Sequence, residues 1–306
     1  MRLLYLFVIA NYYTIISPIS ADSHLSGGHT TGRDLIEALK SAGYHVNIVT
    51  PVDVFLEPDN ADLNVYFDIF NDPQGSKWFG LLEQKRFLDS NKPCIFAECA
   101  YTGATPYEYG GWNVSEQERY SLDNPVIGLS SALIEKAAFS LFLSPLHLNE
   151  WTNFTKFEIP NAFVYFQKID DKIFNNQNIE RPVNVLYVGA ITEAKGVSEI
   201  QLIFGDNIRF IGRGDVNLIN PENYIGIGTP DQIAFAMNSS KYFVHMPNWK
   251  EASARTVVEA AMCGCKLIVN ENVGACSFGV TDLSNPYYGK KSFNDLVSAI
   301  KSIKGL

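Results

Sequence analysis

The sequence predicts an α/β protein, and three features of its pattern support this. Short apolar runs alternate with helical segments along most of the 306 residues, as in parallel sheets whose strands are joined by helices. This length exceeds what one hydrophobic core usually organises. A polar, asparagine-rich stretch without periodicity divides the alternation in two. We therefore expect two Rossmann-like domains facing each other across a cleft, at residues 1–168 and 183–306, with residues 169–182 as the linker.

Five strands and three helices are predicted in the first part of the chain. Apolar runs predict strands at Leu3–Ala10, Val46–Thr50, Leu63–Phe70, Pro93–Ala97 and Ser140–Leu143. Apolar residues at helical spacing predict helices at Asp34–Ala42, Lys77–Ser90 and Ser131–Phe139. The glycines of residues 27–32 predict a glycine-rich loop before the first helix. The first run would also suit a signal peptide, but its length is that of a buried strand, which we favour.

The second part of the chain repeats the alternation. Strands are predicted at Val183–Val188, Ile208–Ile211, Tyr224–Ile227, Tyr242–His245 and Lys266–Asn270. Helices are predicted after Gly196, at Pro230–Asn238, from about Ala254 and at Phe293–Ile303. In sheets of this kind, ligands bind beyond the carboxyl ends of the strands. The loops that follow the strands are therefore the places to look for functional residues.

The composition and the missing motifs exclude several classes of function. A net charge of −9 disfavours nonspecific binding to nucleic acid or to an anionic membrane. Five cysteines without framework spacing argue against a disulfide scaffold and favour a reducing compartment, so we expect a cytoplasmic protein. The sequence has no zinc-site spacing, no P-loop, no Gly-x-Ser-x-Gly and no dinucleotide-binding glycine motif after its first strand. It also has no apolar run long enough to span a membrane.

The most informative segment contains Glu251 and Glu259, two acids that flank a turn and the start of a small-residue helix. Free N–H groups at a helix N-terminus bind anions such as a diphosphate. Ser253 and Thr256 add hydroxyls there, and Arg255 adds a positive charge. Carboxylates accept hydrogen bonds from sugar hydroxyls, and a nucleotide sugar offers both kinds of group. The alternative is that the two acids only stabilise the helix and its surface.

Other candidates lie in the loops of both predicted domains. Lys195 follows a strand at a helix start, where a lysine can neutralise a leaving phosphate, although most lysines are simply solvated. Arg213 stands between two glycines after the next strand, which is also the pattern of a plain turn. Gly28 and His29 are expected to face the cleft from the first domain, or to belong to an ordinary surface loop. His245, within a strand pattern, is interpreted as structural.

Taken together and in this order, these features resemble the retaining glycosyltransferases of the GT-B fold, family four. The matching segments are Gly27-Gly28 with the helix after it, Ile159-Pro160-Asn161, Val188-Gly189 with Lys195-Gly196, and Glu251 to Glu259 followed by Ala260–Gly264. The similarity covers nearly the whole chain and is specific in residues 183–275.

The resemblance implies a role for each matching residue. Glu251 would contact the transferred sugar and Glu259 would hold the ribose. Lys195 would pair with the diphosphate, and Gly28 would let the backbone of the first domain approach the phosphates. The family needs no metal, because protein cations and amides replace it, and its co-substrate is a nucleotide sugar linked to UDP or GDP. The remaining partner would be a hydroxyl acceptor.

The sequence departs from the family at three places. The family usually has an arginine where this chain has Ala190, so Arg213 and Arg255 are the candidates to replace it. The first domain lacks the family's histidine after its fourth strand, where Glu98 and Tyr101 stand instead. We expect Glu98 as a catalytic group and Tyr101, with His29, on the acceptor side.

The third departure is Ala-Ser-Ala after Glu251, where the family usually has glycines.

Our main hypothesis is a metal-independent retaining glycosyltransferase that moves a hexose from a nucleotide-diphosphate sugar to a hydroxyl acceptor. One alternative is a catalytically degenerate protein that only binds nucleotide sugars. Another is an exported, two-lobed ligand-binding protein.

Overall fold

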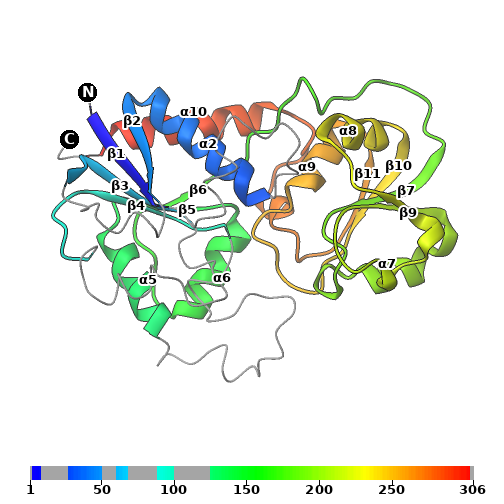
Figure 1. Ribbon diagram of the computed structural model, residues 1–306, viewed down its shortest axis with the longest axis horizontal. Coiled ribbons are helices and arrows are strands. Elements are labelled where there is room, and N and C mark those ends of the chain that lie inside the picture. The colour runs from blue at the N-terminus through cyan, green and yellow to red at the C-terminus, as the bar shows by residue number, and fades with distance from the viewer. Residues whose placement is uncertain (1, 8–26, 50–59, 68–87, 100–124, 304–306) are drawn as a thin grey trace.

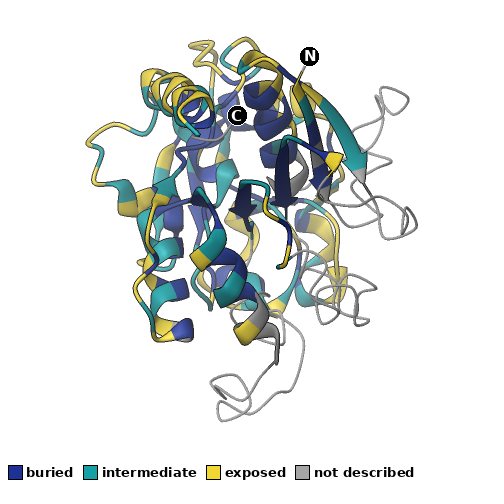
Figure 2. Cartoon of the chain, turned by 90° about the vertical axis from the view of Figure 1, so that its left-hand side faces the viewer, coloured by how far each residue is buried: buried dark blue, intermediate teal, exposed yellow. Residues whose placement is uncertain are grey.

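The protein consists of two α/β halves, each built on a parallel β-sheet with helices on both faces (Figure 1). The computed structural model describes residues 2–7, 27–49, 60–67, 88–99 and 125–303. The central strands of the first sheet are buried along their whole length, and exposed residues lie mainly on helices and loops (Figure 2). The predicted α/β class with two Rossmann-like halves is confirmed.

The first half contains a six-stranded parallel sheet with the strand order β2-β1-β3-β4-β5-β6. Its strands are β1 (Arg2–Phe7), β2 (Tyr44–Val49), β3 (Leu63–Phe67), β4 (Cys94–Ala97), β5 (Phe139–Phe142) and β6 (Ala162–Val164). Strand β1 pairs with β2 on one side and β3 on the other. The strand interpretation of the first apolar run is therefore confirmed for Arg2–Phe7.

The second half contains a five-stranded parallel sheet with the order β11-β10-β7-β8-β9. Its strands are β7 (Val183–Val188), β8 (Ile208–Ile211), β9 (Tyr224–Gly226), β10 (Ser240–His245) and β11 (Lys266–Val269). All five lie where the apolar runs predict them. The runs are most continuous in the central strands β7, β8 and β10, whose residues are mostly buried.

Helices cover both faces of each sheet. They are α2 (Gly27–Ser41), α5 (Pro125–Lys136), α6 (Pro145–Thr155), α7 (Val197–Phe204), α8 (Pro230–Asn238), α9 (Arg255–Met262) and α10 (Tyr287–Lys301). In the second half, Leu186 and Val188 of β7 pack in one core with α8 and α9, whereas Val185 and Tyr187 pack in the other core with α7. This alternation follows from the two-residue period of a strand.

The last helix crosses back to the first half. Helix α10 runs beside α2 (Figure 1), and Phe293, Leu296 and Ile300 belong to the hydrophobic core that α2 forms with the first sheet. Residues 287–301, which the predicted division assigns to the second domain, thus pack in space with the first. The stretch 169–182 has no helix or strand, and the division of the chain there remains a prediction.

One local expectation is wrong. Residues 27–32 were expected as a loop, but α2 already begins at Gly27. A Cβ on Gly32 would lie 3.1 Å from the Phe67 ring, so this glycine lets the helix approach strand β3 closely. The predicted helix Lys77–Ser90 lies mostly outside the described residues. Among the described helices, none combines the length and the apolar character that crossing a bilayer requires.

Candidate active site

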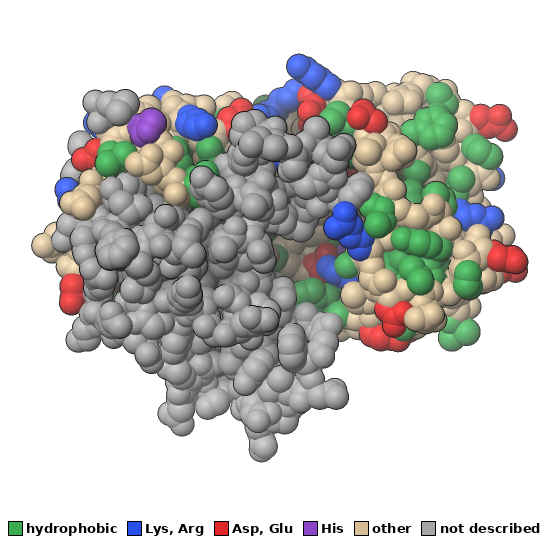
Figure 3. Space-filling view, in the orientation of Figure 1, with side chains coloured by type: hydrophobic (Ala, Val, Ile, Leu, Met, Phe, Trp, Pro, Cys, Tyr) green, Lys and Arg blue, Asp and Glu red, His purple; other side chains and the backbone are tan. Residues whose placement is uncertain are grey.

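Lys195 and Glu251, two of the predicted donor-site residues, lie in the loops that follow two neighbouring strands of the second sheet. The strand order reverses between β10 and β7, so the loops that leave their carboxyl ends run apart. In doubly wound sheets, ligands bind in the crevice at this point. Strand β7 leads to Lys195 in a short 3-10 helix, Glu193–Lys195, and strand β10 leads to Glu251. Figure 3 shows a hollow between the two halves, with acidic and basic side chains close together there.

The backbone holds these two loops against each other. The Asn248 amide donates a hydrogen bond to the Ala194 carbonyl at 3.0 Å, and its side chain donates to the Glu193 carbonyl at 3.0 Å. The Glu251 amide donates to the Asn272 carbonyl at 2.7 Å, in the loop after β11. The positions of the functional side chains are therefore set by hydrogen bonds between three loops.

Glu251 is buried and lies between two basic groups. Its Oε1 accepts a hydrogen bond from Lys195 Nζ, and its Oε2 lies 3.1 Å from His245 Nε2. Burial raises the pKa of Glu251, but the charges of His245 and Lys195 more than offset this and hold it at about 2. Lys195 also lies over the ring of Trp249, with 5.2 Å from Nζ to the centroid. Glu251 is thus ionised at neutral pH.

Helix α9 begins at Arg255, as expected, and no side chain caps its N-terminus. Its cap residue, Ala254, has a left-handed backbone with φ of 65°. Arg255 Nε donates to Glu259 Oε1 at 2.8 Å, one turn further along the helix. Arg255 Nη1 is buried and has no hydrogen-bond partner among the described residues. Burial raises the pKa of the Glu259 carboxyl, which the arginine only partly offsets.

Ser253 has a different environment from the one predicted. Its hydroxyl donates to Gln167 Oε1 at 2.7 Å, and Gln167 Nε2 donates to the Thr31 hydroxyl of α2 at 2.5 Å. All three side chains are buried. Ser253 therefore links the start of α9 to the first half, and its predicted contact with the donor would have to coexist with this bond.

The other predicted residues are more dispersed. Thr256 is half-buried on α9, and Arg213 is exposed in the loop after β8. The Arg213 carbonyl accepts a hydrogen bond from the Ile191 amide at 2.7 Å, which places its loop beside the one that leads to Lys195. Glu98 is fully buried after β4 in the first half.

Three further predictions concern the first half. Gly28 and His29 lie in the first turn of α2, where the structure describes the backbone alone. Tyr101 lies outside the described residues. The roles of these residues, like those of the whole predicted set, stay predictions.

Sequence reasoning missed four residues around this site. His245 was interpreted as structural, yet it touches Glu251. On the first half, Asp34 of α2 accepts a hydrogen bond from the Tyr165 hydroxyl at 2.9 Å, and Arg255 is near enough to lower its pKa. Gln167 bridges to Ser253. Only position in the folded chain reveals these contacts: Asp34 lies in a matching segment but only as part of its helix, and the other three belong to no motif.

The described residues contain no group of three or more His, Cys, Asp or Glu side chains arranged for a metal ion.

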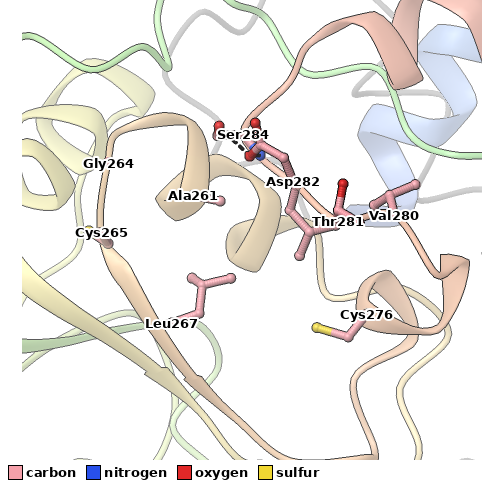
Figure 4. Close-up of a pocket in the computed structure, with 10 residues that line it drawn as sticks. Ala261, Gly264, Cys265, Leu267, Cys276, Val280, Thr281, Asp282 and Ser284 are labelled. Atoms are coloured by element: carbon pink, nitrogen blue, oxygen red, sulfur yellow. Dashed lines mark hydrogen bonds between the residues drawn. The ribbon is translucent and has the colours of Figure 1, made fainter.

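A separate pocket of about 440 Å³ lies at the C-terminal end of α9, where the chain turns into β11 (Figure 4). Cys265, Leu267 and Cys276 line it, together with residues 280–284, and none of the predicted site residues does. Burial raises the pKa of Cys265 to about 11, so this thiol is protonated at neutral pH and a poor nucleophile.

The fold is similar to solved glycosyltransferase structures over nearly its whole length. A sucrose-phosphate synthase from Thermosynechococcus elongatus is 15% identical, with a TM-score of 0.65 and coverage of 99% of this chain and 94% of that one. Anabaena Alr3699/HepE, in complex with UDP and glucose, is 11% identical, with a TM-score of 0.60 and coverage of 99% and 94%. A glycosyltransferase from Rickettsia africae ESF-5 is 13% identical, with a TM-score of 0.53 and coverage of 98% and 91%.

At these identities the likeness shows the fold alone. The chain has the GT-B fold, in which two parallel α/β sheets with helices stand side by side. No protein-family model matches the sequence, and no curated protein sequence matches it.

Proposed function

We propose that the protein is a retaining glycosyltransferase that moves a hexose from a UDP- or GDP-linked sugar to a hydroxyl acceptor without a metal ion. The observation that carries the proposal is the contact between Lys195 and Glu251 at the point where the strand order of the second sheet reverses. Two residues predicted for the same donor, 56 positions apart, meet there. Solved neighbours with this fold, in complex with UDP or with UDP-glucose, give further support.

Each group has a chemical task in this proposal. Lys195 and the N-terminus of α9 stabilise the charge that develops on the leaving diphosphate. Glu251 accepts hydrogen bonds from the sugar, and Glu259 accepts them from the ribose. Closure of the two halves excludes water and so limits hydrolysis of the donor. The proposed location is the cytoplasm, because five cysteines without framework spacing favour a reducing compartment.

The first experiment is a donor-hydrolysis screen over UDP- and GDP-linked hexoses, which needs no acceptor. On the best donor, Glu251→Gln is expected to lower turnover by about 100-fold or more, the effect typical of deleting one group that acts on transition-state charge. Glu193→Gln is the matched control, because the Glu193 carboxylate is exposed on the neighbouring loop and, among the described residues, accepts a hydrogen bond only from the Ser198 hydroxyl.

Unchanged turnover in Glu251→Gln would overturn the assignment of this residue. Turnover in the presence of a chelator tests metal independence, and the anomeric configuration of the product, read by NMR, tests retention.

Ala190, which replaces an arginine expected from the resemblance, favours a second candidate, a protein that binds nucleotide sugars without turning them over. Binding measured by calorimetry, with no hydrolysis and no transfer to a broad acceptor panel, would support that candidate.

A further inference from the structure

His245 is a buried histidine whose polar edge faces the carboxylate of Glu251. It ends strand β10, and only 2% of its surface is exposed. Its Nε2 lies 3.1 Å from Glu251 Oε2, while the other oxygen, Oε1, is bonded to Lys195 Nζ. The two oxygens of one buried carboxylate are thus divided between a lysine and a histidine.

Packing, and not hydrogen bonding, fixes the ring of His245. The ring stacks on Tyr187 of the neighbouring strand, with centroids 5.8 Å apart and planes 14° apart. It also lies parallel to Phe243, with centroids 6.4 Å apart. Among the described residues, neither ring nitrogen has an aligned hydrogen-bond partner. The stack therefore holds the imidazole edge toward Glu251.

We propose that His245 is a positioning residue of the donor site, which holds the Glu251 carboxylate in place when Lys195 turns to the diphosphate. This inference rests on the proposed function. Lys195 is bonded to Glu251, so a diphosphate has to compete with a carboxylate for the same ammonium group. A buried carboxylate that loses its only partner is strongly destabilised. His245 provides the second partner that lets Lys195 leave.

Two substitutions separate this role from simple packing. His245→Phe keeps a flat ring for the stack on Tyr187 but removes both nitrogens. His245→Gln loses the ring but can place an amide nitrogen near the position of Nε2. If His245 acts on Glu251, the glutamine variant restores donor binding, whereas a packing role predicts that phenylalanine is the milder change.

The test measures the affinity of the wild type and the variants for UDP, GDP and ADP by calorimetry, after melting curves have shown that each variant folds. We expect His245→Phe to weaken binding of the preferred nucleotide about tenfold, since the hydrogen bond that Nε2 can donate to the Glu251 carboxylate once Lys195 has turned to the diphosphate is worth about that factor. His245→Gln should recover most of the loss. In a Glu251→Gln background there is no carboxylate charge to hold, so His245→Phe should no longer change the affinity.

Wild-type affinity in His245→Phe, or an equal loss in both backgrounds, would overturn the proposal. If the wild type binds none of the three nucleotides, the proposed function fails, and with it the donor role of His245. The melting curves distinguish these cases, because non-additive shifts for His245→Phe and Glu251→Gln report their contact without any ligand.

Discussion

Asp34 gives the sharpest stability prediction, because it is a buried acid with a large change in pKa. It lies on α2, where the first half meets the start of α9, and its surface is 8% exposed. Burial raises the pKa of Asp34 from 3.8 to about 6, although Arg255 and the hydrogen bond from Tyr165 oppose the shift. The perturbation is Asp34→Asn, which keeps the shape and cannot ionise.

The sign and size follow from proton linkage. A raised pKa means that the folded protein binds the proton more tightly than the unfolded chain does. This contribution to stability is complete below pH 3.8 and is lost as the pH rises through about 6. Since a difference of one in pKa corresponds to about 1.4 kcal/mol, the loss is about 3 kcal/mol. Between pH 4 and pH 7, where part of this change has already taken place at the acid end, the stability of Asp34→Asn relative to the wild type should therefore rise by about 2.4 kcal/mol.

Urea unfolding of both proteins at several pH values across this range measures the difference, in which all other titrating groups cancel. In thermal melts the same change corresponds to about 4 °C for a chain of this size. Asp282→Asn is the control: hydrogen bonds from Ser284 lower the pKa of this exposed carboxyl, so its relative stability should stay flat above pH 4. A pH-independent difference for Asp34→Asn would refute the reasoning.

Three further substitutions test the site's framework. Ala254→Gly should stabilise the protein by about 1 kcal/mol, because Ala254 has a left-handed backbone with φ of 65°; a lower melting temperature would contradict this. Gly196→Ala should destabilise it by about 2 kcal/mol or more and weaken nucleotide binding, since its Cβ would lie 2.3 Å from the Met246 carbonyl oxygen; calorimetry checks the affinity. Arg181→Ala should cost about 2 kcal/mol in urea unfolding. Arg181 binds the carbonyls of Met237, Ser240 and Cys263.

The second sheet and the meeting of Lys195 with Glu251 could be predicted because they depend on simple regularities. Strands such as Val183–Val188 and Ile208–Ile211 are continuous apolar runs, and the structure has the same bounds. Residues that follow parallel strands lie at one edge of the sheet, so two loops after neighbouring strands bring their side chains together. The fold class follows from the same alternation.

Other features depend on contacts that no local pattern encodes. The glycines at 27–32 look like turn residues, although Gly32 serves close packing between a helix and a strand. His245 looks like a core residue of an apolar strand, and only the return of the chain after Pro247 brings Glu251 to its side.

Helix α6 is a different case, because a local pattern marks its start: Ser144 caps it and Pro145 stands in its first turn. The sequence analysis did not predict this helix.

The segment around Glu251 also connects the two halves, which ties the donor site to the first sheet. Lys250 forms an ion pair with Glu150 of α6 at 2.6 Å, and Ser253 bonds to Gln167. Arg255 lies close enough to Asp34 to affect its ionisation. A rotation of one half against the other would have to break or rearrange contacts made within four residues of Glu251. In the proposed glycosyltransferase, a movement of the first half would therefore be passed through these contacts to the loop that carries Glu251.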